Sequence, residues 1–268
     1  MPSTKLSVVL ITLNEAANLP RTLASLRFGP DIELEIVVVD SGSADRTVEL
    51  AREAGACVLT EPWKGFGRQK NFAIAHATGD WILSLDADEE LSRELATEIA
   101  ALLHSPDAQS AYRIPRLNHF LGRPLRHGGY WPDPKLRLFR PGAALYEERD
   151  VHEAMRPTKA AEGRVGQLKG HLIHHCYPTL DEYIEHMNRY SSTGARMLVE
   201  RGRAPRSLAG LLTQATLNPA LTFVYNYALR LGFLDGAAGL LQHLNHSAYI
   251  HWKYVKAWQL ARQRPRIS

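Results

Sequence analysis

The chain has 268 residues, of which 45% are hydrophobic and 22% are charged, a balance typical of folded globular proteins that excludes a disordered chain. Its two cysteines, Cys57 and Cys176, exclude a disulfide framework and fit a reducing compartment. Of the 32 Lys and Arg and the 28 Asp and Glu, residues 181–268 hold 11 and 5, so the net charge of +4 divides into +6 for this segment and −2 for the remainder. A basic end of this kind suits nucleic acid or an anionic membrane surface.

Strands and helices alternate over the first 104 residues. Nearly continuous apolar runs predict buried strands at 6–12, 35–40, 57–59 and 81–85. Helical spacing of apolar residues follows each run, and Ser92 is placed to cap the last of these helices. The alternation predicts an open parallel sheet with right-handed crossovers.

Polar residues follow three of these strands at the point where each ends. They are Thr12, Asn14 and Glu15, then Asp40, then Asp86 and Asp88. Ligands of such sheets bind beyond the carboxyl ends of the strands, so these side chains should meet in one crevice. Carboxylates in that position are the hard oxygen ligands that divalent cations prefer.

Two common nucleotide-binding motifs are missing from the sequence. It contains no G-x-x-x-x-G-K-[ST], which excludes a P-loop protein. Gly65 and Gly67 give only part of a G-x-G-x-x-G, because Lys70 stands where the third glycine belongs. The dinucleotide fingerprint is therefore rejected.

From 111 to 153 the pattern changes. Residues 111–114 and 136–140 alternate like half-exposed strands, and a stretch rich in Gly, Pro, Arg and Trp at 122–134 is typical of a loop that closes over a site. We expect one further strand over 165–175, ending in His174 and His175. These histidines fit no zinc-binding pattern.

The chain beyond Pro178 is mostly helical in pattern, with helices expected over 181–201, 220–231 and from 236 onward. No apolar stretch approaches the ~20 residues needed to span a bilayer. Amphipathic helices that lie in a membrane interface fit better than a nucleic-acid-binding end. The alternative is that the helices pack on the catalytic domain.

Four motifs in order carry a resemblance to a known family: Thr12-Leu13-Asn14-Glu15, the run from Val39 to Thr47, Gly67-Arg68-Gln69-Lys70-Asn71 and Asp86-Ala87-Asp88. Together they resemble the family 2 glycosyltransferases with the GT-A fold. The continuation resembles the lipopolysaccharide-core β-1,4-glucosyltransferase branch, through Phe120–Arg123, Trp131–Asp133, Arg137–Phe139, Val151–Glu153 and Gly232–Gly236.

The resemblance implies an α/β fold, a GT-A-type Rossmann-like open mixed sheet with helices on both faces, plus C-terminal amphipathic helices. We expect a catalytic domain over 1–178, with a nucleotide-sugar-binding half (1–104) and an acceptor-side half (105–178). Residues 179–268 would form a helical, membrane-associating region.

The implied activity is inverting, metal-dependent transfer from a UDP-sugar, UDP-glucose being the expected donor, to a lipid-linked saccharide such as the lipopolysaccharide inner core. Such an enzyme would act on the inner, cytoplasmic face of the membrane. The alternatives are transfer to a polyprenyl phosphate or another envelope glycan, and a non-catalytic sugar-nucleotide-binding module.

The resemblance also implies roles for single residues in donor binding. Asp40 would accept a hydrogen bond from uracil, with Thr12, Asn14 and Glu15 lining the base and ribose. Asp88, with Asp86, would hold Mg²⁺ or Mn²⁺ against the diphosphate. Positive charge near the phosphates or sugar would come from Arg68, Lys70 and Arg137.

Inverting transfer needs a base for the proton of the acceptor hydroxyl. Glu153 is the expected base because it follows the acceptor-side loop, and Asp150 is its rival. A GT-A site sometimes recruits a late histidine as a metal ligand, which makes His174, or else His175, a candidate.

Overall fold

The computed structural model describes residues 3–148 and 154–263, and the chain divides into two compact units. Residues 1–117 and 133–174 form the first unit, and residues 118–132 and 175–268 form the second. Residues 118–132, expected in the acceptor-side half of the catalytic domain, thus belong to the second unit.

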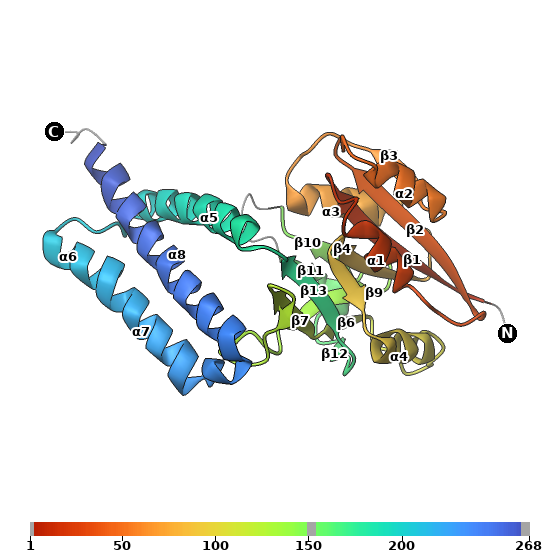
Figure 1. Cartoon of the computed structure of the whole chain (residues 1–268). Helices are drawn as coiled ribbons and strands as arrows, with labels where there is room; N and C mark the ends of the chain where they lie inside the picture. The colour runs from red at the N-terminus through yellow and green to blue at the C-terminus, as the bar shows by residue number, and fades with distance from the viewer. Residues whose placement is uncertain (1–2, 149–153, 264–268) are drawn as a thin grey trace. The chain divides into compact units, whose positions relative to one another are not determined.

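A mixed sheet of seven strands forms the centre of the first unit (Figure 1), in the order β12-β6-β9-β4-β1-β2-β3. Its strands are β1 (Thr4–Thr12), β2 (Ile32–Asp40), β3 (Cys57–Thr60), β4 (Trp81–Asp86), β6 (Ala111–Ile114), β9 (Lys135–Phe139) and β12 (Val165–Gln167). The first four along the chain, β1 to β4, are parallel, as predicted. Strand β9 runs antiparallel to both β4 and β6, which makes the sheet mixed.

Helices cover both faces of this sheet, because alternate residues of the central strands point to opposite sides. Val8 and Leu10 belong to a core that also contains residues of α1 (Leu19–Ala24), α2 (Thr47–Glu53) and α4 (Arg93–Leu103). Val9 belongs to a second core, shared with α3 (Phe66–Ala75). The predicted cap of α4 is confirmed, since Ser92 Oγ accepts a hydrogen bond from Leu95 N.

The prediction of a single strand over 165–175 is wrong. The structure has β12 in the large sheet and a separate strand β13 (Leu172–Tyr177), whose Leu172–His174 pair antiparallel with the short strand β5 (Glu89–Leu91). The backbone N–H groups of Lys169 and Gly170 bond to the carboxylate of Glu98, which closes a turn between the two strands. A side chain at Gly170 would lie 2.5 Å from Leu95 Cα, so this turn packs directly on the helix backbone. Two shorter strands, β10 (Ala144–Tyr146) and β11 (Met155–Pro157), pair separately.

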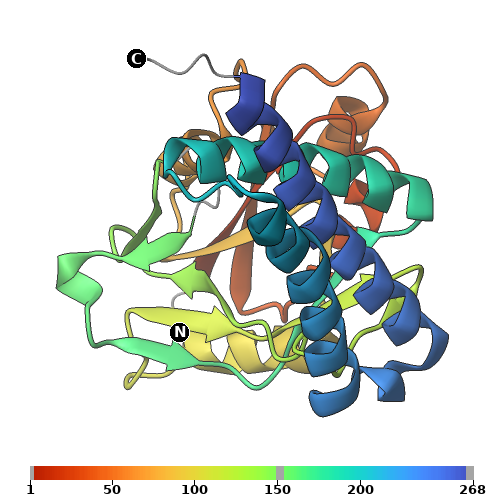
Figure 2. The same ribbon diagram turned by 90° about the vertical axis from the view of Figure 1, so that its left-hand side faces the viewer.

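The second unit contains α5 (Leu180–Glu200), α8 (Gly236–Gln263) and a continuous helical rod over 208–229, with α8 packed against the other two (Figure 2). The rod joins α6 (Leu208–Leu212), η2 (Thr213–Leu217), α7 (Asn218–Val224) and η3 (Tyr225–Leu229), of which η2 and η3 are π-helical. Strands β7 (Arg116–Phe120) and β8 (Arg123–Pro124) form a hairpin. In the part of the chain that is described, no helix is long and apolar enough to cross a membrane.

The Gly232–Gly236 motif of the second unit anchors the loop at 126–129. Both Arg126 N and His127 N donate to the carboxylate of Asp235, and the His127 ring lies 2.7 Å from it. The buried ring of His243 lies close to Gly128 and Gly232, where any side chain would come within 2.3 Å of its Nε2 atom. Burial accordingly lowers the pKa of His243. This motif therefore has a structural role.

The tight turn before β13 yields a test of the fold. Gly170→Ala should lower the free energy of unfolding by about 1–3 kcal/mol, because the new methyl group would overlap the backbone of α4. Gly29→Ala is the matched control, since its methyl group would meet no atom within 4 Å. Urea unfolding of both variants measures the difference; equal stabilities would contradict the described packing.

Candidate donor and metal site

An acidic turn connects β4 with β5 at the carboxyl edge of the sheet. Asp86 is the last residue of β4, and the turn Ala87-Asp88 leads into Glu89, the first residue of β5. The hydroxyl of Thr22 donates to Ala87 O at 2.7 Å, which ties the turn to α1. Glu89 Oε2 accepts from Asp86 N at 3.0 Å and closes the turn from the other side. The backbone of the turn is thus held at Asp86 N and at Ala87 O.

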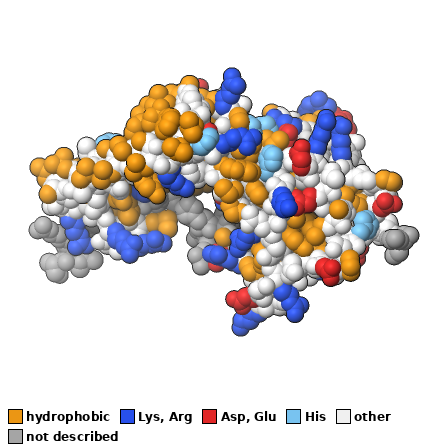
Figure 3. All heavy atoms as spheres, turned by 90° about the horizontal axis from the view of Figure 1, so that it is seen from below, with side chains coloured by type: hydrophobic (Ala, Val, Ile, Leu, Met, Phe, Trp, Pro, Cys, Tyr) orange, Lys and Arg blue, Asp and Glu red, His pale blue; other side chains and the backbone are white. Residues whose placement is uncertain are grey.

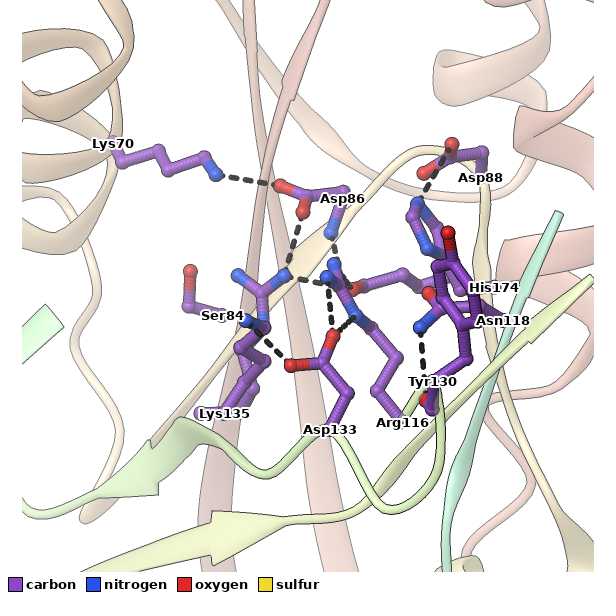
Figure 4. Close-up of polar contacts among 12 residues, drawn as sticks. Lys70, Ser84, Asp86, Asp88, Arg116, Asn118, Tyr130, Asp133, Lys135 and His174 are labelled. Carbon is purple, nitrogen blue, oxygen red and sulfur yellow. Dashed lines mark hydrogen bonds and ion pairs between the residues drawn. The ribbon is translucent and has the colours of Figure 1, made fainter. Parts of the chain in front are cut away.

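Each carboxylate oxygen of Asp86 contacts a buried cation (Figure 4). Lys70 Nζ lies 2.7 Å from Oδ1, and Arg137 Nη2 lies 2.6 Å from Oδ2. Burial alone would raise the pKa of Asp86, but the charges of Arg137 and Lys70 outweigh it and hold that pKa well below its ordinary value. Tyr146 supports both cations, through a 2.7 Å hydrogen bond from Arg137 and a ring beneath Lys70.

Asp88 has a different partner. Its Oδ2 lies 3.3 Å from His174 Nε2, which comes from β13 (Figure 4). The pairing of β13 with β5 sets this arrangement, because His174 stands opposite Glu89, the residue after Asp88. Burial would raise the pKa of Asp88, and the hydrogen bond and charge of His174 lower it below the ordinary value. Asp88 is therefore an anion, and its neighbour His174 is a residue of a kind that commonly binds metals.

These residues fit a divalent cation of the kind that completes its shell with phosphate and water. Among the described residues, no group of three or more His, Cys, Asp or Glu side chains is arranged to hold a metal ion. Mg²⁺ sites that take one or two carboxylates and draw their other ligands from substrate phosphates need no such group. Asp88 and His174 would offer one oxygen and one nitrogen to such a cation, while both oxygens of Asp86 are engaged by Lys70 and Arg137.

Asp40 organises the neighbouring loops instead of pointing outward. Its Oδ1 accepts from the backbone N–H groups of Gly42 and Ser43, and its Oδ2 accepts from the hydroxyls of Thr12 and Ser43. Burial would raise the pKa of Asp40, but these hydrogen bonds lower it. A carboxylate has about four acceptor positions, and here internal donors use four of them.

Asn14 and Glu15 lie beside the same loop. Asn14 has a left-handed backbone (φ 57°), and its side-chain oxygen accepts from Ala44 N. Burial raises the pKa of Glu15, and the negative charges of Asp88 and Asp86 add to that effect. The predicted convergence of the three strand ends is therefore present in the structure. The roles predicted for these residues at the base and ribose remain predictions.

The remaining predicted site residues are Arg68 and the two candidates for the base. Arg68 is exposed and pairs with Glu148 at 3.2 Å. Glu153 and Asp150, the two candidates for the base, lie outside the described residues.

The sequence assigned no role to four residues that form a connected set of ion pairs at the acidic turn. Glu89 is fully buried and contacts Arg137 at 2.7 Å and Arg116 at 3.2 Å, and Arg116 in turn contacts Asp133 at 2.7 Å. Lys135 Nζ lies 2.8 Å from the other oxygen of Asp133. The run of acids from Asp86 to Glu90 was the one available signal for Glu89.

A family model described as "Glycosyl transferase family 2" matches residues 7–185, about two thirds of the chain. The chain belongs to glycosyltransferase family 2. Its acidic turn, Lys70, Arg137 and His174 all lie inside the matched segment of this family 2 enzyme.

Several relatives agree with this assignment. The family 2 chain is 31% identical, over all of its length and 98% of the other, to the lipopolysaccharide core biosynthesis glycosyltransferase LpsC of Rhizobium meliloti. An uncharacterized glycosyltransferase of Rickettsia prowazekii, RP128, is 33% identical over 74% of this chain and 70% of that one. The mannosyltransferase PcManGT of Pyrobaculum calidifontis, solved with GDP-Man and Mn²⁺, shares the fold with a TM-score of 0.52 and 17% identity, over 97% of this chain and 88% of that one. The fold class implied by the sequence resemblance is confirmed.

The paired cations around Asp86 predict a pH-dependent stability. Asp86→Asn leaves Lys70 and Arg137 without their shared anion and should cost about 3 kcal/mol at pH 7. Because the pKa of Asp86 is depressed in the folded protein, its stabilisation is complete above its unfolded pKa of about 4 and is lost as the pH falls below that value. The stability gap between wild type and variant should therefore narrow below pH 4.

Urea unfolding at a series of pH values measures this gap. Glu49→Gln is the control, since Glu49 belongs to an exposed ion pair with Arg46 and its replacement should leave the stability nearly unchanged at every pH. A gap for Asp86→Asn that widens toward low pH would contradict the described pairing.

Proposed function

We propose that this family 2 enzyme transfers a sugar, with inversion, from a UDP-sugar to a lipid-linked saccharide acceptor of the lipopolysaccharide inner core. The similarity to LpsC over almost the whole of both chains carries the acceptor class. UDP-glucose is the donor to test first. The same donor half would also serve a polyprenyl phosphate acceptor, and a screen of acceptors separates the two.

The donor half of the reaction needs positive charge where the nucleoside diphosphate leaves. We assign Asp88 and His174 as protein ligands of Mg²⁺ or Mn²⁺, whose bound charge would stabilise the departing diphosphate. Asp86 holds Lys70 and Arg137 at the same edge of the sheet, so their positions are set before a donor arrives. Thr12, Asn14, Glu15 and Asp40 would shape the base and ribose site, mainly through the loop that Asp40 anchors, and Arg68 would add charge near the sugar.

The acceptor half needs a group that removes the proton of the attacking hydroxyl. Asp86, Asp88 and Asp133 all have lowered pKa values, which makes them poor proton acceptors near neutral pH. We propose Glu153 as the base because it follows the acceptor-side loop in the sequence, with Asp150 as its rival.

We also propose that the second unit binds an anionic membrane surface through the rod at 208–229. The sequence has no charged residue from Ser207 to Leu229, and Arg201, Arg203, Arg206 and Arg230 stand just beyond its ends. The rod exposes a row of large apolar side chains: Leu208, Leu212, Leu217, Leu221, Val224, Tyr225 and Leu229, with Leu208 and Leu229 each 71% exposed. Hydrophobic side chains gather over the helices of this unit in Figure 3, with Lys and Arg along their border.

The occupant of this face is inferred from charge. Residues 201–268 contain nine Lys and Arg and a single acid, Asp235. Two copies of so basic a segment would repel one another, whereas anionic headgroups attract it while the leucines enter the interface.

The assignment of the base can be tested by separating donor binding from transfer. Glu153→Gln should bind UDP and Mn²⁺ as the wild type does but lose about two to four orders of magnitude in transfer, because only proton removal is impaired. Asp88→Asn should instead lose metal-dependent UDP binding. Calorimetry and a transfer assay measure the two effects, with Asp150→Asn as the comparison.

Full turnover by Glu153→Gln would reject Glu153 as the base. A wild-type protein that binds UDP and Mn²⁺ but neither transfers nor hydrolyses UDP-glucose would instead be a sugar-nucleotide-binding module.

Membrane binding is tested with single charges on the apolar row. Leu212→Glu and Leu221→Glu should each weaken sedimentation with vesicles of phosphatidylcholine and phosphatidylglycerol, because an acid at an exposed position meets the anionic interface. Leu180→Glu, an exposed leucine at the start of α5, is the matched control. If Leu212→Glu and Leu221→Glu sediment with vesicles as the wild type does, the proposed surface is wrong. If the wild type instead forms a dimer that both variants abolish, the surface binds a second copy of the chain.

A further inference from the structure

Glu89 is the one acid of the turn whose side chain is completely buried and which the proposed chemistry does not use. A buried carboxylate is costly unless it is paired and hydrogen-bonded. Glu89 has three donors: Asp86 N at 3.0 Å, Arg137 Nη2 at 2.7 Å and Arg116 Nη1 at 3.2 Å. Each donor leads to a different part of the site.

The first connection reaches the proposed metal ligands themselves. Through Asp86 N, Glu89 fixes the backbone of the turn that carries Asp88. Through the pairing of β5 with β13, its backbone stands opposite His174. Glu89 is therefore linked to both proposed ligands, to Asp88 through the turn and to His174 through the pairing of β5 with β13.

The second connection reaches Asp133. Arg116 donates to Glu89 with Nη1 and to Asp133 with Nη2 and Nε, at 2.7 and 3.1 Å for the latter two (Figure 4). The charges alternate along one chain of contacts: Lys70, Asp86, Arg137, Glu89, Arg116, Asp133 and Lys135. Removing a charge in the middle leaves two guanidinium groups, those of Arg137 and Arg116, facing each other without an anion between them.

We infer that Glu89 is a positioning residue for the metal site, and that Arg116 couples it to Asp133. Asp133 belongs to the Trp131-Pro132-Asp133 sequence, and its contacts with Arg116 and Lys135 lower its pKa, outweighing the opposing effect of burial. The segment around Asp133 and the acidic turn thus both contact the guanidinium of Arg116. A substitution in either one should therefore alter the position of the other. This inference rests on the proposed function.

Binding of Mn²⁺ measures this role without relying on catalysis. The full-length protein is titrated with Mn²⁺ at saturating UDP, and the electron paramagnetic resonance signal of free Mn²⁺ reports the bound fraction. Glu89→Gln keeps the size of the side chain and removes its charge, and it should weaken Mn²⁺ binding by about 10-fold or more, as changes to the partners of metal ligands do.

Glu35→Gln is the matched control. Glu35 accepts hydrogen bonds from Ser7 and Thr78 and an ion pair from Lys5, so it is another carboxylate with several partners, but it lies on β2 away from the acidic turn. It should lower thermal stability and leave Mn²⁺ binding unchanged. If Glu89 has only a structural role, the two variants will both be less stable and will both bind Mn²⁺ as the wild type does, which overturns the inference.

Asp133→Asn tests the coupling and also serves if Glu89→Gln fails to fold, because the side chain of Asp133 is partly exposed. As a single substitution it should weaken Mn²⁺ binding by about 3-fold. Added to Glu89→Gln it should have no further effect, since the contact of Arg116 with a charged Glu89 is already lost. An unchanged affinity in Asp133→Asn, or fully additive effects, would overturn the coupling. A wild-type protein that binds no Mn²⁺ with UDP would reject the proposed function, and the assignment of Glu89 with it.

Discussion

The pairing of Asp86 with two buried cations is the interaction on which the carboxyl edge of the sheet depends. Lys70 comes from α3 and Arg137 from β9, and neither could lie buried beside the other without an anion between them. Asp86 therefore joins α3, β4 and β9 at the carboxyl end of the sheet. The antiparallel pairing of β9 with β4 contributes to this interaction, because it places Arg137 beside Asp86.

Two acids one residue apart consequently have different surroundings. Both oxygens of Asp86 contact cations, whereas Asp88, on the turn, contacts His174 of β13. On the proposed function, the first fixes positive charge and the second binds the metal. A dielectric well below that of water makes both arrangements stiff, because any displacement of one partner leaves the other incompletely compensated. The site is preorganised by its electrostatics as much as by packing.

Much of this edge could be predicted from the sequence, because local patterns encode it. A buried strand followed by acids locates Asp86 and Asp88, and the alternation of strands and helices places Asp40 and Thr12 beside them. The contacts of Arg116 and Asp133 could not be predicted, since they join segments with no local pattern in common. The break between β12 and β13 was equally hidden, because the close approach of Gly170 to α4 depends on the tertiary structure.

The rod at 208–229 shows how local geometry and function meet outside the sheet. Its exposed leucines and Tyr225 lie four apart except for the step from Leu212 to Leu217, which crosses the π-helical stretch η2, and Val224 lies beside Tyr225. A π-helix has more residues per turn, so the longer step keeps the row on one side while Ala215 and Pro219 remain buried. The opposite side is fixed to α8 through Ser247 and His251, which bond to the carbonyls of those two residues. A rod held in this way keeps its leucines exposed. On the proposed function, confinement of the enzyme and its lipid-linked acceptor to the same surface would raise the effective concentration of the two.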